Sequence, residues 1–487
     1  MQLVAYGVQD VYLTGNPQIT YWKVIYKRHT NFACEPIEQS FSGTADFGKT
    51  SVTATVARNG DLMSRVYLRC KVQLSRKAGS SGKFAWVRRL GHSMIREVSC
   101  QIGGATIDRQ TGDWMNVWHE LARDSNLDVG YSEMIGDTPH MTELSEDEKS
   151  ATLYVPLTFW FCRNPGLALP LIALQYHEVK INLELSPMDR CLWAGKKSGS
   201  NYEKYTSAYN TPLANASLYV DYIFLDTDER RRMAQNPHEY LIEQLQFTGE
   251  ESVGSSSNKI KLNFNHPCKE LVWTVQKDSV VQECDNFEDD KLVCKARGAQ
   301  YFNYTDAVDA LPNSLKAFTK VSDGTGLEMN ELIESDGDLV NTDVGEGKVS
   351  DAAAFVVSEK ALDMHCWGQN PVVTAKLQLN GQDRFSEREG SYFDLVQPWQ
   401  HHTRHPDTGI NVYSFALRPE EHQPSGTCNF SRIDNATLHL TLSAHTLRQP
   451  NDTANSSDPD TAKVRVYAVN YNVLRIMSGM GGLAYSN

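Results

Sequence analysis

Short segments in which apolar and polar residues alternate recur along most of the chain. In the clearest of them, Val179, Ile181, Leu183 and Leu185 alternate with polar neighbours. A period of two is typical of a half-buried strand, with one face in the core and the other facing outward. The same composition predicts strands at 51–56, 64–72, 97–102, 153–161, 178–185 and 218–225, and again at 240–247, 259–264, 270–275, 372–379, 412–417, 436–442 and 464–471.

Helical periodicity is sparse. The best candidate helix is 113–123, where large apolar residues recur at helix spacing. Its apolar positions are Trp114, Val117, Trp118 and Leu121. A second candidate is 226–235, with Asp226 as its N-cap. Many short strands and few helices indicate β-sandwiches and not alternating βαβ units.

The two halves of the chain resemble each other in the order of their motifs. A glycine turn followed by an Asp-Arg pair occurs at 103–109 and again at 380–384. In each half a strand, a Pro/Gly turn and a second strand follow, and a tyrosine-bearing strand closes the half. Chance is one interpretation, because Gly-Gly and Asp-Arg pairs are common. A duplicated sandwich accounts for the whole series, so we expect an all-β chain of two consecutive sandwiches.

Shifts in composition predict how the chain is divided. We expect an N-terminal arm at 1–36, a first domain at 37–225, a linker at 226–239 and a second domain at 240–487. Within the second domain, 281–365 carries eighteen Asp and Glu against seven Lys and Arg, a difference of −11 in charge. Such a turn-rich, charged insertion belongs in long loops outside the core.

Charge and cysteine content exclude several classes of function. The formal net charge is −13, whereas a chain that gripped nucleic acid would present a basic face. We therefore expect no direct contact with nucleic acid. Ten cysteines without a C-x-x-C pair argue against a disulfide framework or a zinc knuckle. They predict mostly buried thiols in a reducing compartment.

Two stretches bear on targeting and membranes. Residues 1–12 lack a charged start followed by a long apolar core, so no secretory signal is expected. The most apolar stretch, 154–176, is interrupted by Arg163 and by prolines. We expect two buried strands joined by a turn there, because a spanning helix needs about 20 mostly apolar residues. The chain is therefore expected to be made and assembled outside the secretory route.

The opening arm is basic in an acidic chain. Within residues 2–31, Lys23, Lys27 and Arg28 stand against the single acid Asp10. One interpretation is a docking arm that lies on a partner or near lipid headgroups. The other is a helix end with solvated basic residues.

The sequence contains only weak candidates for a metal-binding or catalytic site. His401, His402 and His405 form the densest histidine cluster, but they lie between two prolines in loop-like sequence. We expect a polar surface turn there and no metal. Other acid and histidine pairs lack the spacing of a metalloprotease helix or a calcium loop, namely His177-Glu178, His238-Glu239 and Asp336 with Asp338. Because no nucleotide loop or nucleophile elbow is present either, we expect no cofactor and no catalysis.

Asn-x-Ser/Thr motifs raise the question of glycosylation. Without a secretory signal the usual machinery would not reach them, so chance matches are one interpretation. Asn303, inside the acidic stretch, is the best candidate for a glycan. The other positions are Asn215, Asn429, Asn435, Asn451 and Asn455.

Several blocks resemble one family. These blocks are 13–20 (LTGNPQIT), 58–62 (RNGDL), 167–178 (LALPLIALQYHE), 263–267 (NFNHP), 379–384 (LNGQDR), 423–432 (QPSGTCNFSR) and 471–479 (YNVLRIMSG). They resemble the major capsid proteins of nucleocytoplasmic large DNA viruses, in particular the algal-virus and iridovirus branch. The blocks are distributed over the whole chain, and the resemblance is weakest at 281–365.

This resemblance implies two consecutive eight-stranded jelly rolls and a structural shell subunit. It implies a homotrimer of pseudo-hexagonal outline that tiles an icosahedral virion shell, assembled in the host cytoplasm over an internal membrane. Its expected partners are further trimers, minor capsid proteins and penton proteins, with the arm near the membrane.

Two other functions use the same fold. An outer-loop role in carbohydrate binding or host attachment is the main alternative, and a cupin-like enzyme is a further one. The enzyme would need a convergent polar pocket and a bound metal.

Overall fold

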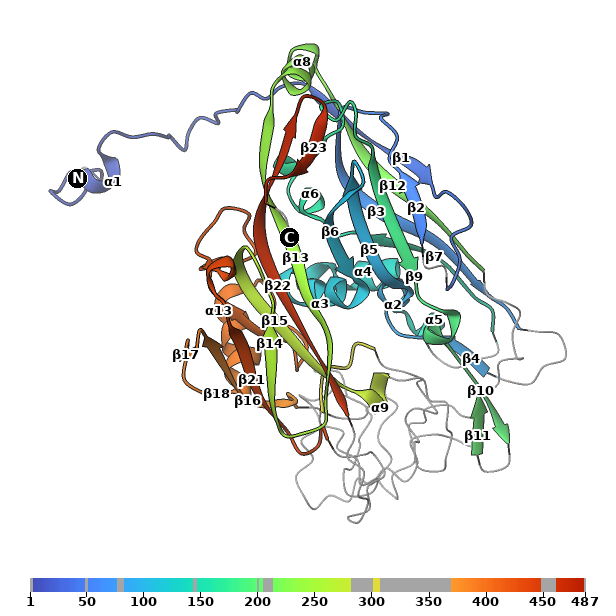
Figure 1. Cartoon of the computed structure of the whole chain (residues 1–487). Helices are drawn as coiled ribbons and strands as arrows, with labels where there is room; N and C mark the ends of the chain where they lie inside the picture. The colour runs from blue at the N-terminus through green and yellow to red at the C-terminus, as the bar shows by residue number, and fades with distance from the viewer. Residues whose placement is uncertain are drawn as a thin grey trace.

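The computed structural model describes residues 3–48, 51–76, 83–142, 147–198, 201–204, 213–281, 301–306, 369–447 and 461–485. Figure 1 shows the two halves of the chain side by side, with the N-terminal segment leaving the body at one end. Most of the acidic stretch, including Asp336 and Asp338, lies outside the described residues.

The first half forms a sandwich of two antiparallel sheets. One sheet has the order β1-β12-β3-β7, and β8 pairs with β3 at its end. Its strands are β1 (Phe32–Ser40), β12 (Leu213–Leu225), β3 (Leu62–Leu74), β7 (Lys149–Pro156) and β8 (Leu169–Pro170). The facing sheet consists of β2 (Val52–Thr55), β9 (Val179–Leu185), β5 (Ile95–Ile102) and β6 (Ala105–Thr111) in that order. A small extra sheet comprises β11 (Asn201–Lys204), β10 (Leu192–Ser198) and β4 (Lys83–Trp86).

The second half repeats this arrangement. Its larger sheet has the order β13-β22-β15-β19, with short strands added to β15 and β22. The strands are β13 (His238–Val253), β22 (Ala462–Met477), β15 (Pro267–Lys277), β19 (Asn411–Ser414), β20 (Cys428–Asn429) and β23 (Met480–Leu483). The facing sheet contains β14 (Ser257–Leu262), β21 (Ala436–Leu442), β16 (Val372–Leu379), β17 (Gln382–Asp383) and β18 (Arg388–Glu389).

The two sandwiches correspond strand for strand. β1-β12-β3-β7 matches β13-β22-β15-β19, and β2-β9-β5-β6 matches β14-β21-β16-β17. Even the short additions agree, since β8 and β20 pair with the corresponding strands β3 and β15. Eight strands in two facing sheets make a jelly roll. The prediction of two consecutive jelly rolls is confirmed.

Alternating burial explains why these segments form strands. β9 and β21 have every second residue buried, as a strand with one face on a core requires. In β9 the buried set is Val179, Ile181, Leu183 and Leu185, which is the predicted one. Each sandwich encloses its own apolar core between its two sheets.

Helices are short and lie mainly between strands. They are α1 (Val11–Thr14), α2 (Leu90–Met94), α3 (Gly112–Ala122), α4 (Asp128–Ile135), α5 (Pro139–Thr142), α6 (Trp160–Arg163), α7 (Met188–Cys191), α8 (Thr227–Gln235), α9 (Asp278–Val281) and α13 (Gln397–His401). A π-helical turn, η3 (Tyr392–Val396), leads into α13. Short 3-10 turns are η1 (Ser125–Leu127), η2 (Pro165–Leu167) and η4 (Phe430–Arg432). Within the described part of the chain, no helix has the length and apolarity of a bilayer span.

Three local predictions are wrong. The predicted strand 153–161 stops as β7 at Pro156, and α6 follows at Trp160. Phe159, Trp160 and Phe161 are all buried, so this apolar run has no alternation that distinguishes strand from helix. The predicted second strand within 154–176 is reduced to the two-residue β8. Asp226 precedes α8, but its side chain makes no capping hydrogen bond.

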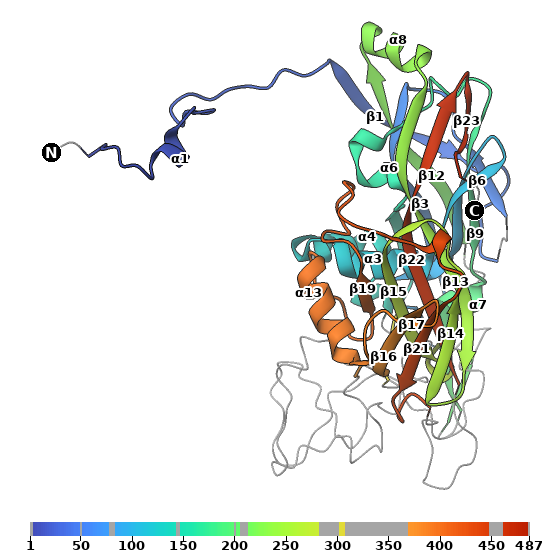
Figure 2. The same cartoon turned by 60° about the vertical axis from the view of Figure 1, so that its left-hand side comes forward.

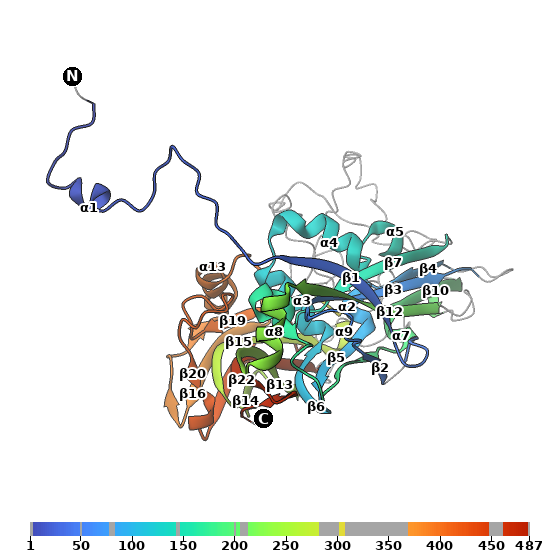
Figure 3. The same ribbon diagram turned by 90° about the horizontal axis from the view of Figure 1, so that it is seen from above.

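The N-terminal arm lies away from both sandwiches. Figures 2 and 3 show it extending from the start of β1, with α1 as a single turn along it. Large apolar side chains are exposed throughout the arm, including Tyr12 at 89%, Tyr21 at 90% and Trp22 at 96%. The basic residues predicted for this arm therefore stand among exposed aromatic side chains, and not at the end of a packed helix.

Candidate functional site

The helix α3 joins the two sandwiches. Thr111 at the end of β6 caps it, because its hydroxyl oxygen accepts a hydrogen bond from the Trp114 backbone N–H at 3.2 Å. The four predicted apolar positions are buried, with Trp118 the most exposed at 9%. They pack on the outer face of the larger sheet of the second half, and their contacts are Val272, Tyr304, Ile410, Val412, Tyr467 and Val469. The helix predicted from its spacing therefore holds the first sandwich to the second.

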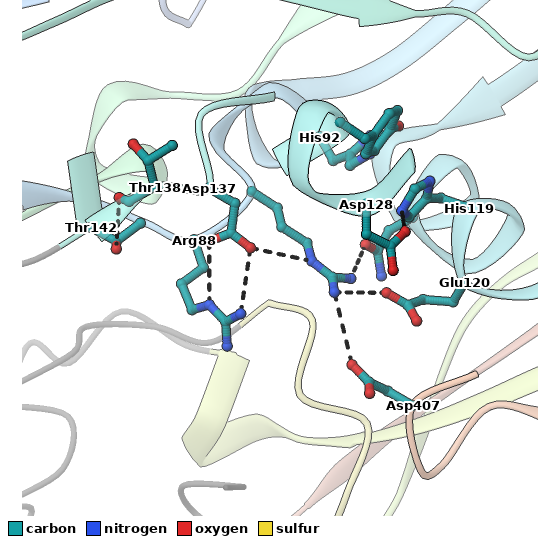
Figure 4. A network of polar contacts seen from close by, with 12 residues as sticks. Arg88, His92, His119, Glu120, Asp128, Asp137, Thr138, Thr142 and Asp407 are labelled. Carbon is teal, nitrogen blue, oxygen red and sulfur yellow. Dashed lines mark hydrogen bonds and ion pairs between the residues drawn. The ribbon is translucent and has the colours of Figure 1, made fainter. Parts of the chain in front are cut away.

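Beside this apolar contact lies a network of charged groups around Arg89, whose partners Glu120, Asp137 and Asp407 are labelled in Figure 4. The Arg89 guanidinium is 2.7 Å from Glu120 on α3, and within 4 Å of Asp137 and of Asp407 from the second half. Glu120 also pairs with Arg404 at 3.4 Å. Because Glu120 is almost fully buried, these two cations are what makes its charge tolerable.

A second ion pair of this network involves α4. Arg404 pairs with Asp128 at 2.5 Å, and its backbone N–H donates to the carbonyl of Leu121 on α3. The loop that follows α13 in the second half is therefore tied to two helices of the first half. The contacts around Arg89 and those of Arg404 lie at different points of the junction, so together they restrict both the angle and the distance between the sandwiches.

Two histidines at the junction are held neutral. Burial and the nearby Arg89 charge lower the pKa of His92 to about 3. Burial and the surrounding positive charges lower the pKa of His119 to about 2. The Tyr131 hydroxyl lies 2.8 Å from Nε2 of His92. The Tyr131 ring stacks on the His119 ring, with 3.8 Å between the ring centroids. A neutral His92 accepts the hydrogen bond that this phenol donates.

Strand edges also connect the halves. The backbone N–H of Leu245 in β13 donates to the buried Asp108 of β6 at 3.1 Å. Burial raises the pKa of Asp108 to about 6, although this and other hydrogen bonds oppose the shift. Gln244 donates to the carbonyl of Ile107 beside it. The two halves thus share hydrogen bonds as well as an apolar contact.

A cleft of about 1070 Å³ opens between the sandwiches next to these strands. Its charged groups of opposite sign pair with one another, for example Arg465 with Glu250 at 2.8 Å and Arg109 with Glu97 at 3.1 Å. Arg465 also lies 3.7 Å from Asp113 at the start of α3. Several charged side chains of the lining are therefore held in ion pairs with one another.

The histidine cluster is not the polar surface turn that was predicted. His401 ends α13, and the His402 side chain is fully buried between Glu270 and Glu420, at 3.1 and 2.9 Å. Burial alone lowers the pKa of His402, but the two carboxylates outweigh it and raise the pKa to about 9. His405 is exposed. His402 is therefore a structural cation, and the sequence carried no signal for its two partners, which are distant in the chain.

A neighbouring buried carboxylate, unlike this cluster, connects the two halves. Glu243 of β13 pairs with Lys269 at 2.7 Å and with Arg163 of α6 at 3.0 Å. Burial raises the pKa of Glu243, but His422, Arg163 and Lys269 outweigh this and lower the pKa to about 2. The Arg163 guanidinium also stacks on the ring of Trp118, 3.9 Å from its centroid. The first half thus reaches a buried charge of the second.

The remaining predicted pairs do not meet in a site. His177 lies against the backbone of Gly481, 3.0 Å from its carbonyl oxygen, where the C-terminal hairpin packs on the first sandwich. His238 starts β13 and bonds the Met233 carbonyl at 2.7 Å. In the described ranges, no cluster of three or more His, Cys, Asp or Glu side chains is arranged to hold a metal ion.

Most of the described cysteines are packed in the cores, as expected. Cys70, Cys100, Cys191 and Cys268 are buried free thiols, while Cys34 on β1 is exposed. Burial raises the pKa of the Cys191 thiol to about 12, so it stays protonated and unreactive. Cys162 and Cys428 are partly buried, and Cys284, Cys294 and Cys366 lie outside the described residues.

Asn303, the candidate glycan site, is inside the molecule. It is 8% exposed, and its side-chain oxygen accepts hydrogen bonds from the Thr305 backbone N–H and hydroxyl, at 3.1 and 2.7 Å. The Gln276 side chain donates to the Asn303 carbonyl at 3.3 Å. A glycan there would have to be attached before the segment packs. Asn215, Asn429 and Asn435 are exposed, whereas Asn451 and Asn455 lie outside the described residues.

The comparisons with known proteins agree with this geometry. The family model for the large eukaryotic DNA virus major capsid protein matches residues 229–482, and the model for the major capsid protein N-terminus matches 20–226. The major capsid protein of Phaeocystis pouchetii virus is 58% identical, over 100% of this chain and 99% of its own.

Solved structures extend this likeness to the fold. The crystal structure of PBCV-1 VP54, fitted into a reconstruction of the virophage Sputnik, has a TM-score of 0.66 and 37% identity, and the match covers 96% of this chain and 100% of that one. The Faustovirus major capsid protein has the same TM-score at 12% identity, covering 97% and 94%, and supports the fold alone. The chain therefore belongs to the major capsid protein family of large eukaryotic DNA viruses: it is a double jelly-roll subunit of the virion shell and not an enzyme.

Proposed function

We propose that three copies of this chain form a homotrimeric, pseudo-hexameric capsomer, and that these capsomers tile an icosahedral shell. The observation that carries the proposal is the strand-for-strand duplication within one chain. Three copies then supply six nearly equivalent jelly rolls, which fill sixfold lattice positions with threefold symmetry. The fixed junction through α3 supports this, because a tile needs a constant angle between its two sandwiches.

The division of the chain into domains is a second part of the proposal. The four-part division into an arm at 1–36, jelly rolls at 37–225 and 240–487 and a linker at 226–239 remains our proposal. β1 begins at Phe32, so the last residues of the arm already belong to the first sheet. The helix α8 occupies most of the linker.

The arm is proposed to contact minor capsid proteins, and penton proteins are proposed as neighbours of the capsomers. The internal membrane is proposed to lie close to the arm. Exposed Tyr21, Trp22 and Tyr26 beside Lys23 and Lys27 support a docking role. Aromatic side chains with basic neighbours are suited to both protein interfaces and lipid headgroups. No comparison favours the alternative of carbohydrate binding or host attachment.

The oligomeric state tests the proposal directly. Native mass spectrometry of the purified full chain should give a single species of three times 54.7 kDa, about 164 kDa. Class averages from electron microscopy should show a six-lobed outline. A monomer at micromolar concentration, without that outline, would sink the proposed capsomer while leaving the family membership intact.

A further inference from the structure

The duplication makes two helices equivalent. α3 follows the β5–β6 hairpin of the first jelly roll, and the η3–α13 helical segment follows the corresponding β16–β17 hairpin of the second. Both helices therefore leave the same corner of their own sandwich. In α3 the apolar face is buried against the second jelly roll of the same chain.

The corresponding face of the η3–α13 segment is exposed. Trp399 is 80% exposed, Leu395 48% and Val396 38%, while Phe393, Gln397 and Pro398 turn inward. We call Leu395, Val396 and Trp399 the α13 face. Figure 2 shows α13 standing out from the second sandwich on the side where α3 and α4 also lie.

This face is held rigidly. Asp394 accepts a hydrogen bond from the Gly409 backbone N–H at 3.3 Å, and Gln397 accepts one from that of Ser414 at 3.1 Å. The buried pairs of His402 with Glu270 and Glu420 fix the residue that directly follows the helix. π-helical turns are uncommon and recur at functional sites. Here the turn presents large apolar side chains from a fixed position, as a preformed contact surface does.

Register identifies the surface that corresponds to the one under α3. Just beyond β7 the Leu157 N–H donates to the Val66 carbonyl, and just beyond β19 the Phe415 N–H donates to the Lys269 carbonyl. Matching these two hydrogen bonds aligns β3 with β15.

With β3 and β15 aligned in this way, the cross-strand pair Val272–Val412 under α3 corresponds to Arg69–Tyr154 in the first jelly roll. In the neighbouring strand, Val469 corresponds to Tyr219.

These corresponding residues make an interface-like surface. Tyr154 is 40% exposed and packs edge-to-face on Tyr219 at 6.3 Å, and Arg69 lies over the Tyr219 ring at 5.9 Å. We call Arg69, Tyr154 and Tyr219 the tyrosine face. Tyrosine and arginine are enriched in protein interfaces, where they pair with aromatic anchors such as tryptophan.

We propose that the α13 face of one copy packs on the tyrosine face of the next copy, repeating between chains the contact that α3 makes within the chain. This rests on the proposed trimer, in which each second jelly roll is followed by the first jelly roll of a neighbour. Such a head-to-tail contact closes after three copies. Trp399 is the anchor, as Trp118 is within the chain.

Chemical cross-linking tests the pairing in the full chain. Gln400→Cys next to Trp399 and Thr152→Cys beside Tyr154 place one thiol at the edge of each face. Cys34→Ser removes the native thiol that is exposed in the described part of the chain. A short bis-maleimide should then give covalent dimers and trimers on a denaturing gel. The matched control replaces Thr152→Cys by Val373→Cys, an exposed position on β16 in the smaller sheet of the second jelly roll. It should give only the background of the single-cysteine variants.

Substitution tests the anchor. Trp399→Glu should weaken association by at least about 30-fold per contact, since an interface tryptophan is typically a hot spot. Val373→Glu adds the same charge to an exposed apolar position on another face and should leave the trimer unchanged. Unchanged circular dichroism of the Trp399→Glu monomer would show that folding is intact.

The outcomes separate this proposal from the trimer itself. If the unsubstituted chain is a monomer, the proposed capsomer fails, and this pairing fails with it. If the chain is a trimer but Trp399→Glu stays trimeric and the Gln400/Thr152 pair does not cross-link above background, only the assigned contact is overturned.

Discussion

His402 and Glu270 form an ion pair with 3.1 Å between Nε2 and Oε2, and neither side chain reaches solvent. Glu420 holds the other ring nitrogen at 2.9 Å. The pair connects the residue after α13 to β15, an inner strand of the larger sheet of the second jelly roll. Removing the histidine would leave a carboxylate charged and unpaired in the core.

We therefore expect His402→Ala to lower the free energy of unfolding by about 3–5 kcal/mol, the usual effect of breaking a buried pair. Urea denaturation followed by intrinsic fluorescence measures it. His405→Ala is the matched control, because this exposed side chain should change stability by less than about 0.5 kcal/mol. Equal unfolding midpoints for the two variants would contradict a stabilising role of the pair.

The same pair predicts an alkaline dependence. The pKa of His402 is raised from 6.5 to about 9 in the folded chain. Its contribution is therefore fully present below pH 6.5 and is lost as the pH rises through about 9. The stability difference between the unsubstituted chain and His402→Gln should shrink over this window. A difference that stays constant from pH 6.5 to 9.5 would rule the titration out.

The neutral histidines of the junction predict acid sensitivity. Because the pKa values of His92 and His119 are lowered from 6.5 to about 3 and about 2, the unfolded chain binds protons that the folded chain does not. Stability should fall as the pH drops below 6.5, by about 2 kcal/mol per histidine at pH 5. Thermal unfolding of His119→Gln should show a shallower slope over this range, whereas His29→Gln on the exposed arm should not.

Two glycines with positive φ separate steric from conformational effects. A Cβ on Gly409 (φ +100°) would lie 1.9 Å from the Tyr304 carbonyl oxygen, whereas one on Gly381 (φ +80°) meets no atom within 4 Å. Gly381→Ala should cost about 1 kcal/mol, from the left-handed conformation alone. Gly409→Ala should cost clearly more, because backbone must move at the junction. Equal shifts in melting temperature would contradict the close approach.

Charge predicts how capsomers associate. With −13 per chain, three copies carry 3 × −13 = −39 before ions compensate. Repulsion between such particles acts over about a Debye length, ~8 Å at physiological salt. Association between trimers should therefore strengthen as sodium chloride rises from low to physiological concentration. Sedimentation velocity across that range measures it, and a flat profile would exclude electrostatic control.

Many strands and the main helix could be predicted from the pattern of neighbouring residues. The strands predicted at 372–379 and 436–442 have the bounds of β16 and β21, because a period of two over a half-buried strand is written into adjacent residues. The helix at 113–123 was found for the same reason, since the spacing of its tryptophans is a local property. The alternation of apolar and polar residues could not identify an element where every residue is buried, as at Trp160 in α6, or where a strand is short, as in β8.

The sequence alone determined the double sandwich, its repeat order and, through the distinctive blocks, the family. Only the tertiary structure decided that His402 is a buried cation, that Asn303 is packed inside, and that α3 is covered while the α13 face is exposed. Alternation reports which side of an element is apolar, because it depends on neighbours in the chain. Which distant surface, if any, covers that side depends on residues hundreds of positions away, and only three-dimensional packing brings them together.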